Sequence, residues 1–310
     1  MLERIAAIAL NSYRENVRAR LLHGLFALAI ATAGYSLIVG AYAFRDTVRV
    51  VSDLGGASVS AYGIVVAIVL GATSLYRELE LKTAFPILAR PIARWEYLIG
   101  KFVGSWLTLF VFVAVDTGAL LLSIAVLGGN AVATVLCSGL GVLVTVAVVA
   151  WRMPWSRNYA PMVLGIGWMV AGWWLARVVP DDRRVLLGYA VLALAEIGIV
   201  IAIANVFSAF SSPFLTAMLT LGIVIVGRSA DTLARLPERV FGYFVASLAH
   251  AIASVVPNLM VYVPARTLMT GEVPGTNFIV YVARAAMMSV GWTILLMLVA
   301  TLLFRRRDFT

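Results

Sequence analysis

Charged residues are scarce in this sequence. Aspartate, glutamate, lysine and arginine make up 13% of its 310 residues, whereas 62% are hydrophobic and the mean hydropathy is +0.98. An average soluble domain is about a quarter charged, so a soluble fold would lack polar groups for its surface. Apolar runs of about 20 residues instead match roughly 30 Å of bilayer hydrocarbon. The composition excludes a soluble domain and predicts an all-α polytopic membrane protein, a single domain over residues 1–310.

Cysteine and histidine are almost absent. The single cysteine, Cys137, excludes an intrachain disulfide, and we expect it to be a small buried hydrophobic residue. The two histidines, His23 and His250, stand far apart, whereas a metal site needs at least three clustered ligands. The sequence therefore predicts no metal site.

Catalytic and nucleotide-binding motifs are also missing. No GxxxxGK[ST] phosphate-binding loop occurs, and neither lysine, Lys82 or Lys101, has a glycine-rich approach. An intramembrane enzyme would need paired catalytic groups at converging helix ends, and no Ser-His pair or His-Glu metal motif is present. We expect no catalytic residue and no bound cofactor in this chain.

The formal net charge of +9 does not indicate nucleic-acid binding. The basic residues form short clusters at the ends of apolar runs, where they meet anionic headgroups and set the topology. We therefore expect these basic residues to interact with the lipid bilayer, and we expect no nucleic-acid partner.

The apolar runs predict about eight membrane spans. They are Leu21–Phe44, Ser58–Leu75, Phe102–Leu127, Ala131–Trp151, Pro161–Val178, Val185–Phe207, Phe214–Val226 and Phe278–Phe304. An even number places both termini on one side. Arginine clusters near both termini, such as Arg305 to Arg307, assign that side to the cytoplasm, although Arg228 and other arginines fall in the expected outer loops.

Residues 2–20 have two faces on a helical wheel. Leu2, Ala9 and Tyr13 share one face, and Arg4 and Arg18 share the other. This pattern predicts a helix lying along the cytoplasmic interface, with a plain cytoplasmic lead-in to the first span as the alternative. The early charges also argue against a cleavable signal peptide.

The segment Val240–Val263 is apolar enough to span the membrane, but a further crossing would place the C-terminal arginines outside. We interpret it as re-entrant or interfacial outer helices broken at Pro257 and Pro264, since irregular backbone at membrane depth must be covered by protein. Residues 228–277 are then the largest extracytoplasmic segment.

The most polar long segment is the predicted cytoplasmic connection over residues 76–102, "YRELELKTAFPILARPIARWEYLIGKF". Proline breaks it into a short apolar turn and a second short helix over Ile92–Ile99. A short amphipathic element of this kind suits a groove on a cytoplasmic partner. The alternative is a solvated loop that joins two spans.

This segment resembles type-2 ABC transporter permeases, which commonly carry "RPI-R-EY-LGK" before the third span. The matching residues are Arg90 to Ile92, Arg94, Glu96, Tyr97 and Leu98 to Lys101. The passages "ALNSYRENVRARLL", "FSAFSSPFLTAMLTLGIVIVG" and "LFRRRDF" fit the same family. The sequence departs from the family's usual six spans through an apparent inserted helix pair at 131–178, and at Lys82, where relatives often have glycine.

The resemblance implies a coupling helix that receives motion from a separate ABC ATPase, which would hold ATP and Mg. The expected coupling residues are Glu78, Glu80, Phe85, Leu88, Arg90, Pro91, Arg94 and Glu96. It further implies two paired permease copies, export across a bacterial inner membrane and cytoplasmic termini. Substitution of Arg94 by glutamate or of Pro91 by alanine is expected to impair transport and spare insertion.

Other functions remain open at this point. One alternative is a permease-like subunit that transmits ATPase motion to an extracytoplasmic protein, as in maturation or gliding machines that share this shape. An intramembrane enzyme and a passive scaffold are weaker alternatives. The substrate cannot be read from the sequence, because apolar helices offer similar surfaces to lipids, drugs and glycan carriers.

Two carboxylates fall inside predicted spans, Asp116 in the third and Glu196 in the sixth. An ionisable group at membrane depth is costly unless it faces protein or water, so each is a candidate functional residue. Neither has a basic residue within one helical turn in the sequence. The alternative for both is a protonated or hydrogen-bonded packing residue.

Overall fold

The computed structural model describes residues 1–18, 20–43, 46–80, 93–272 and 277–305, and these are helical without any β-strand. The α-helices are α1 (Leu2–Arg18), α2 (Arg20–Ala41), α3 (Thr47–Glu80), α5 (Arg94–Leu127), α6 (Val132–Arg152), α7 (Ala160–Leu175), α8 (Pro180–Ser208), α9 (Pro213–Arg228), α10 (Ala230–Ala234), α11 (Glu238–Phe241), α12 (Tyr243–Val255), α13 (Arg266–Thr270) and α14 (Phe278–Arg305). Short 3₁₀ turns occur at Pro154–Asn158, Ala176–Val178 and Met260–Tyr262.

The prediction of an all-α polytopic membrane protein is confirmed. Within the described residues, six helices are long and apolar enough to cross a membrane: α3, α5, α6, α7 together with its 3₁₀ turn, α8 and α14. The first predicted span corresponds to α2, of 22 residues, and the seventh corresponds to α9, of only 16 residues. Each predicted span is therefore a helix, but not all are full-length.

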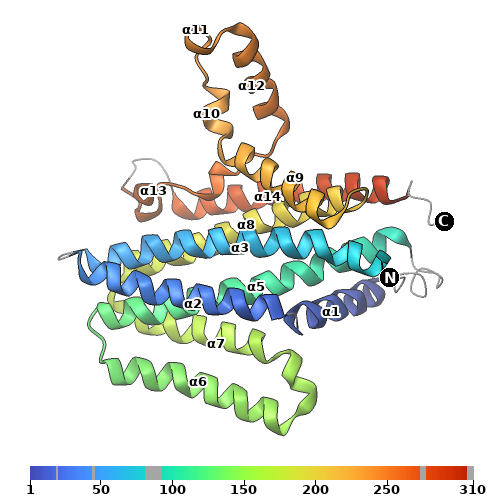
Figure 1. Ribbon diagram of the computed structural model, residues 1–310. Coiled ribbons are helices and arrows are strands. Elements are labelled where there is room, and N and C mark those ends of the chain that lie inside the picture. The colour runs from blue at the N-terminus through green and yellow to red at the C-terminus, as the bar shows by residue number, and fades with distance from the viewer. Residues whose placement is uncertain (19, 44–45, 81–92, 273–276, 306–310) are drawn as a thin grey trace.

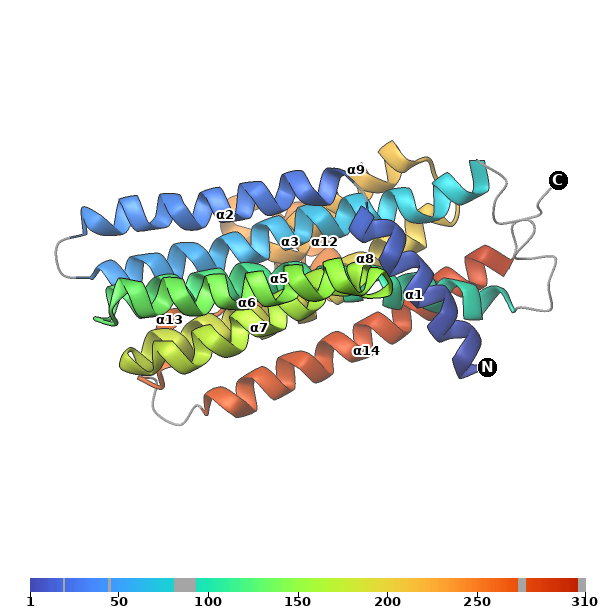
Figure 2. The ribbon, with the colours of Figure 1, turned by 90° about the horizontal axis from the view of Figure 1, so that it is seen from below.

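The long helices run side by side in one bundle (Figures 1 and 2). Helix α1 begins, and helix α14 ends, at the same end of this bundle, which we call the terminal end; the opposite end is the distal end. Helices α3, α5 and α8 form the centre, because each packs against the other two. Helix α8 is apolar all round and buried over most of its length, as expected for a helix enclosed by others.

Small residues allow the central helices to approach closely. A Cβ atom added to Gly71 of α3 would lie 2.4 Å from the Cβ of Ala204 in α8. Helices in a bilayer associate largely through such close packing, because lipid tails are as apolar as their side chains. The pairing of α3 with α8 therefore depends on glycine at this position.

Helix α5 begins earlier than the third span predicted at Phe102. The expected separate short helix over Ile92–Ile99 is not formed, since Arg94 to Leu127 is one continuous helix. The residues before Gly100 favour helix and contain no proline after Pro91, so nothing interrupts the helix there. The polar end of the predicted coupling segment is thus the first two turns of a membrane helix.

The predicted inserted pair forms a layer at the edge of the bundle. Helix α7 packs against α5, and α6 lies outside α7 (Figure 1). Cys137 on α6 is exposed, so the expectation that it is buried is wrong. The reason is that α6 has few neighbours besides α7, and its apolar outer face is left for lipid.

Glycine at position 118 sets the distance between the edge layer and α5. A Cβ atom there would lie 2.8 Å from the Cβ of Trp168 and 2.9 Å from the backbone nitrogen of Met169. We expect Gly118→Ala to push α7 outward and to lower the free energy of unfolding by about 1–3 kcal/mol, as overpacking does. Thermal unfolding in detergent measures this change.

The matched control is Gly141→Ala on α6, where an added Cβ meets nothing within 4 Å. Alanine favours helix over glycine, so this variant should be neutral or slightly more stable. Equal melting temperatures for the two variants would contradict the packing role of Gly118.

Helix α9 does not run the length of the bundle. Its 16 residues extend about 24 Å, less than the hydrocarbon thickness, and it starts at the terminal end. Helices α10, α11 and α12 then leave the bundle sideways as an arm (Figure 1). Val240–Val263 accordingly forms short helices, with α12 ending at Val255 before Pro257, and does not cross the bundle as a continuous helix.

The chain returns from the arm to the point where α9 ends. The amide of Leu259 donates to the carbonyl of Gly227 at 3.0 Å, so the backbone at this break is hydrogen-bonded within the protein. The hydroxyl of Tyr262 donates to the carbonyl of Ala285 in α14 at 3.2 Å. Such coverage is what irregular backbone between membrane helices requires.

Candidate functional site

The predicted coupling residues lie at the terminal end, and the structure describes only part of them. Phe85, Leu88, Arg90 and Pro91 lie outside the described residues. Glu78 and Glu80 belong to the last turn of α3, and their side chains are outside the described set as well. Two residues of the eight, Arg94 and Glu96, have described side chains.

Arg94 joins the start of α5 to the end of α14. Its Nη1 donates to the carbonyl oxygens of Phe304 at 3.3 Å and of Arg305 at 3.0 Å. The last carbonyls of a helix lack partners within the helix and carry partial negative charge, so a guanidinium satisfies them well. Arg94 is therefore an anchor between two membrane helices.

Glu96 caps the helix that Arg94 begins. Its Oε2 accepts a hydrogen bond from the amide of Ala93 at 3.2 Å, and the side chain is buried. A glutamate at this position satisfies an amide that the helix leaves free and is favoured by the helix dipole. Within the described residues, Glu96 thus fixes where α5 starts.

Helix α1 lies across the first turns of α5 (Figure 2). Lys101 of α5 lies 3.8 Å from Glu15 of α1, and the amide of Asn16 donates to Ser105 Oγ and Thr108 Oγ1, each at 3.5 Å. Glycine at 104 permits this contact, since a Cβ there would lie 2.5 Å from the carbonyl oxygen of Ala9.

Helix α1 also reaches the connection between α6 and α7. Arg14 Nη2 donates to the hydroxyl of Tyr159 at 2.8 Å, and Arg18 Nη2 donates to Asn158 Oδ1 at 3.1 Å. These two contacts link the amphipathic helix α1 to the edge layer of α6 and α7. On the same helix, burial and secondarily the nearby Tyr159 raise the pKa of Tyr13 to about 12, so its hydroxyl stays protonated at neutral pH.

An ion pair lies in the middle of the bundle. The carboxylate of Glu196, fully buried, accepts two hydrogen bonds from Arg228, from Nε at 2.9 Å and from Nη2 at 3.0 Å. Ser60 Oγ of α3 accepts from Arg228 at 2.7 Å and donates to Glu196 at 3.0 Å. Helices α3, α8 and α9 therefore meet at one cluster of hydrogen-bonded polar side chains, which we call the central polar group.

The depth of this ion pair follows from the helix lengths. Glu196 is about 24 Å along the helix axis from Pro180 and about 18 Å from Ser208, the two ends of α8. Arg228 is the last residue of α9, where a cation complements the negative end of the helix dipole. The short α9 therefore places an arginine where a full span would place an apolar side chain.

Asp116 on α5 is the second intramembrane carboxylate. It is buried, and within the described residues neither of its oxygen atoms has a hydrogen-bond partner. The structure does not bring it to Arg228, and it is not among the residues of the central polar group. Its role as a candidate functional residue stays a prediction.

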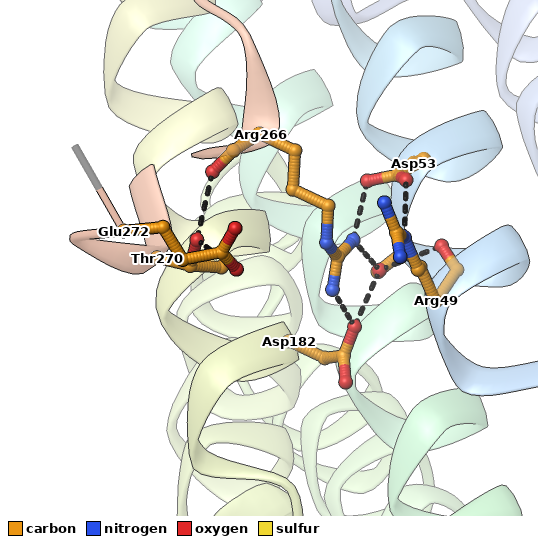
Figure 3. Close-up of polar contacts among 7 residues, drawn as sticks. Arg49, Asp53, Asp182, Arg266, Thr270 and Glu272 are labelled. Atoms are coloured by element: carbon orange, nitrogen blue, oxygen red, sulfur yellow. Dashed lines mark hydrogen bonds and ion pairs between the residues drawn. The ribbon is translucent and has the colours of Figure 1, made fainter. Parts of the chain in front are cut away.

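A second cluster of charges lies at the distal end (Figure 3). Arg266 is the first residue of α13. Its guanidinium lies between Asp53 of α3 and Asp182 of α8 and is hydrogen-bonded to both. Ser52 Oγ accepts from Arg266 at 2.9 Å and donates to Asp182 at 2.9 Å. Arg49 lies 3.9 Å from Asp53.

Local sequence explains part of this distal cluster. Asp182 is in the first turn of α8, which Pro180 begins, and an acidic residue there is favoured by the helix dipole. Helix α13 ends at Thr270 and is followed by Gly271, whose φ of 79° is a left-handed conformation that glycine adopts without strain. The cluster therefore holds the segment between the arm and α14 against α3 and α8.

Sequence reasoning missed both ion-pair groups. Arg228 was expected in an outer loop, and Arg266 was not singled out. The available signal was an isolated arginine at the end of an unusually short apolar run, together with a lone intramembrane glutamate. Within the described residues, no group of three or more His, Cys, Asp or Glu side chains has a metal-binding arrangement.

One family model matches almost the whole chain. It is described as ABC-2 family transporter protein, and the match covers residues 6–309. No curated protein matches the sequence. The match includes every helix of the bundle, the arm and the predicted coupling segment.

Proposed function

This chain belongs to the ABC-2 family of transporter proteins, and we propose that it is the permease subunit of an ATP-driven exporter whose ATPase is a separate chain. The observation that carries the proposal is the family match over residues 6–309 of a multi-pass helical bundle. On this proposal the protein carries out no covalent chemistry, and ATP and Mg bind to the partner.

The terminal end is the proposed cytoplasmic side. Both α1 and α14 have an end there, and residues 76–102 connect α3 and α5 at the same end. A push on this segment would reach α5 directly, because Arg94 and Glu96 already belong to its first turn. From there it would pass to α14 through Arg94 and to α1 through Lys101. We further propose a bacterial inner-membrane location and two paired permease copies.

The hydrogen bonds of Arg94 to the end of α14 limit which substitutions can test coupling to the ATPase. Arg94→Glu would break the anchor to α14 as well as any ATPase contact, so it does not isolate coupling. Pro91→Ala and Arg90→Glu alter the predicted contact and leave Arg94 itself in place. We expect both variants to reach the membrane at wild-type level and to lose at least about 80% of transport-stimulated ATP hydrolysis by the complex with its ATPase, as expected for an interface centre.

The matched control is Arg152→Glu, which makes the same charge change at the terminal end on the exposed end of α6. This variant should retain ATPase binding and stimulation. If Arg90→Glu behaves like Arg152→Glu, or if no ABC ATPase copurifies with the wild-type protein, the coupling proposal fails.

A second candidate function is transmission of motion to an extracytoplasmic protein. Such a partner would need a surface beyond the distal end. Within the described residues, the arm of α10, α11 and α12 projects sideways and not beyond that end (Figure 1). The geometry therefore favours the exporter. Copurification of an extracytoplasmic protein through residues 228–277, without stimulation of ATP hydrolysis by any solute, would reverse this preference.

A further inference from the structure

An apolar groove runs between α5 and α14 at the terminal end of the bundle. Two adjoining cavities of about 580 and 440 Å³ form it, and both are lined by Ile294 of α14. On α5 the lining side chains follow one helical stripe, Trp95, Ile99, Phe102 and Trp106.

Three polar side chains along the groove already donate to backbone carbonyls of the protein. Trp106 Nε1 donates to the carbonyl of Leu194 at 3.3 Å, Ser289 Oγ to that of Ala195 at 2.6 Å, and Thr301 Oγ1 to that of Met297 at 2.7 Å. The groove therefore offers an apolar wall to its occupant. Its length on α5, from Trp95 to Trp106, is about 16 Å, close to half of a roughly 30 Å hydrocarbon core.

The mouth of the groove is basic. Arg94 and Arg305 line it beside Trp95, and none of the described lining residues is acidic. Arg305 is exposed at the end of α14, and the positive end of the α5 dipole lies at the same place. Arginine and tryptophan at the end of membrane helices are suited to the level of lipid headgroups.

We propose that this groove binds one anionic phospholipid from the leaflet at the terminal end. The phosphate lies at Arg94 and Arg305, and one acyl chain lies along the stripe from Trp95 to Trp106. Two features select this occupant over a peptide or a second copy of the chain: charge at one end only, and a depth of one leaflet. The bound lipid then joins the first turn of α5 to the last turn of α14. The proposal requires only that the helices are in a membrane, and does not depend on the ATPase.

Tryptophan quenching by brominated lipid tests the proposal. The wild-type protein is reconstituted in nanodiscs of phosphatidylcholine that contain equal mole fractions of either acyl-brominated phosphatidylglycerol or acyl-brominated phosphatidylcholine. Tryptophans facing bulk lipid are quenched similarly by both. The groove tryptophans should show stronger apparent binding of phosphatidylglycerol, by about fivefold for each arginine at the membrane surface. Trp106→Phe should remove most of the difference between the two lipids.

Two variants disturb the groove without altering the anchor at Arg94. Arg305→Gln should reduce the preference for phosphatidylglycerol about fivefold, and Leu298→Phe should fill the mouth while keeping both arginines. Arg152→Gln, an exposed arginine at the terminal end on α6, should keep the preference. Equal quenching by the two lipids in the wild-type protein would overturn the proposal. So would an equal loss of preference in Arg152→Gln, which would indicate only general attraction by the net charge. Absence of groove quenching, caused by a protein segment that occupies the groove, would also overturn it.

Discussion

Replacing Arg228 by methionine should be the most damaging single substitution in the membrane core. It leaves the carboxylate of Glu196 fully buried without its counter-ion, with Ser60 as the remaining partner among the described contacts. Removing one member of a buried ion pair costs about 3–5 kcal/mol, because the other charge loses its compensation. We expect a large fall in melting temperature in detergent and reduced accumulation in the membrane.

The partner substitution, Glu196→Leu, should be milder. The side chain of Arg228 is 34% exposed whereas that of Glu196 is fully buried, so the long arginine side chain has more freedom to turn to other polar groups of the protein once the carboxylate is gone. We expect the free energy of unfolding to fall by about 1–3 kcal/mol, less than for Arg228→Met because Arg228 is less enclosed than Glu196. The asymmetry between the two variants is a direct test of the geometry.

The double variant Glu196→Leu with Arg228→Met is the control for this pair. A well-packed apolar pair often replaces a buried ion pair without loss, so most of the stability should return. A thermal-unfolding double-mutant cycle then gives the coupling between the two residues. Additive losses in the double variant would mean that the two side chains do not interact in the membrane.

Arg266→Met should have the second-largest effect, at the distal end. It removes the guanidinium that Asp53 and Asp182 share, and two carboxylates then face each other beside Ser52 (Figure 3). The cluster is partly exposed, so we expect a loss of about 1–3 kcal/mol, less than for a fully buried pair. Thermal unfolding at low and high salt measures this loss, which salt should reduce by screening the repulsion.

The matched control is Arg239→Met, on the exposed helix α11. It removes the same charge, outside the distal cluster, and should be near neutral. Combining Arg266→Met with Asp182→Asn should recover part of the stability, because the like-charge repulsion disappears. An Arg266→Met protein as stable as the Arg239→Met protein would show that the cluster does not hold the distal end together.

The two ion-pair groups hold the chain in place on either side of the interruption after α9, the seventh predicted span. Helix α9 ends at mid-depth, and Arg228 fixes that end to α3 and α8. After the arm, Arg266 fixes the returning chain to the same two helices at the distal end. On the proposed function, any motion that opens the distal end must move these contacts together or break them.

Six of the eight predicted coupling residues have no described side chain, unlike the residues of the two ion-pair groups. The residues Glu78, Glu80, Phe85, Leu88, Arg90 and Pro91 rest on resemblance to the family and stay a prediction. Arg94 and Glu96 have structural roles within α5 and α14, which the family motif alone did not suggest. Helix capping and anchoring are sufficient to explain their place in the motif.

The sequence by itself determined the membrane environment, the helical class and the position of the apolar helices. These follow from short-range properties: apolar run length, helical periodicity and the placement of arginine near helix ends. The family followed from local motifs of the same kind, such as Arg90 to Ile92 and Arg305 to Arg307, with no need for contacts between helices.

Only the tertiary structure decided which polar groups meet. Arg228 is 32 residues from Glu196 and 168 from Ser60, and Arg266 is 213 from Asp53, so no local pattern links them. The side position of the arm, the exposure of Cys137 and the groove between α5 and α14 likewise depend on how helices pack. Helix formation in a bilayer is fixed by each segment alone, whereas partner choice depends on shape and charge contributed by distant segments.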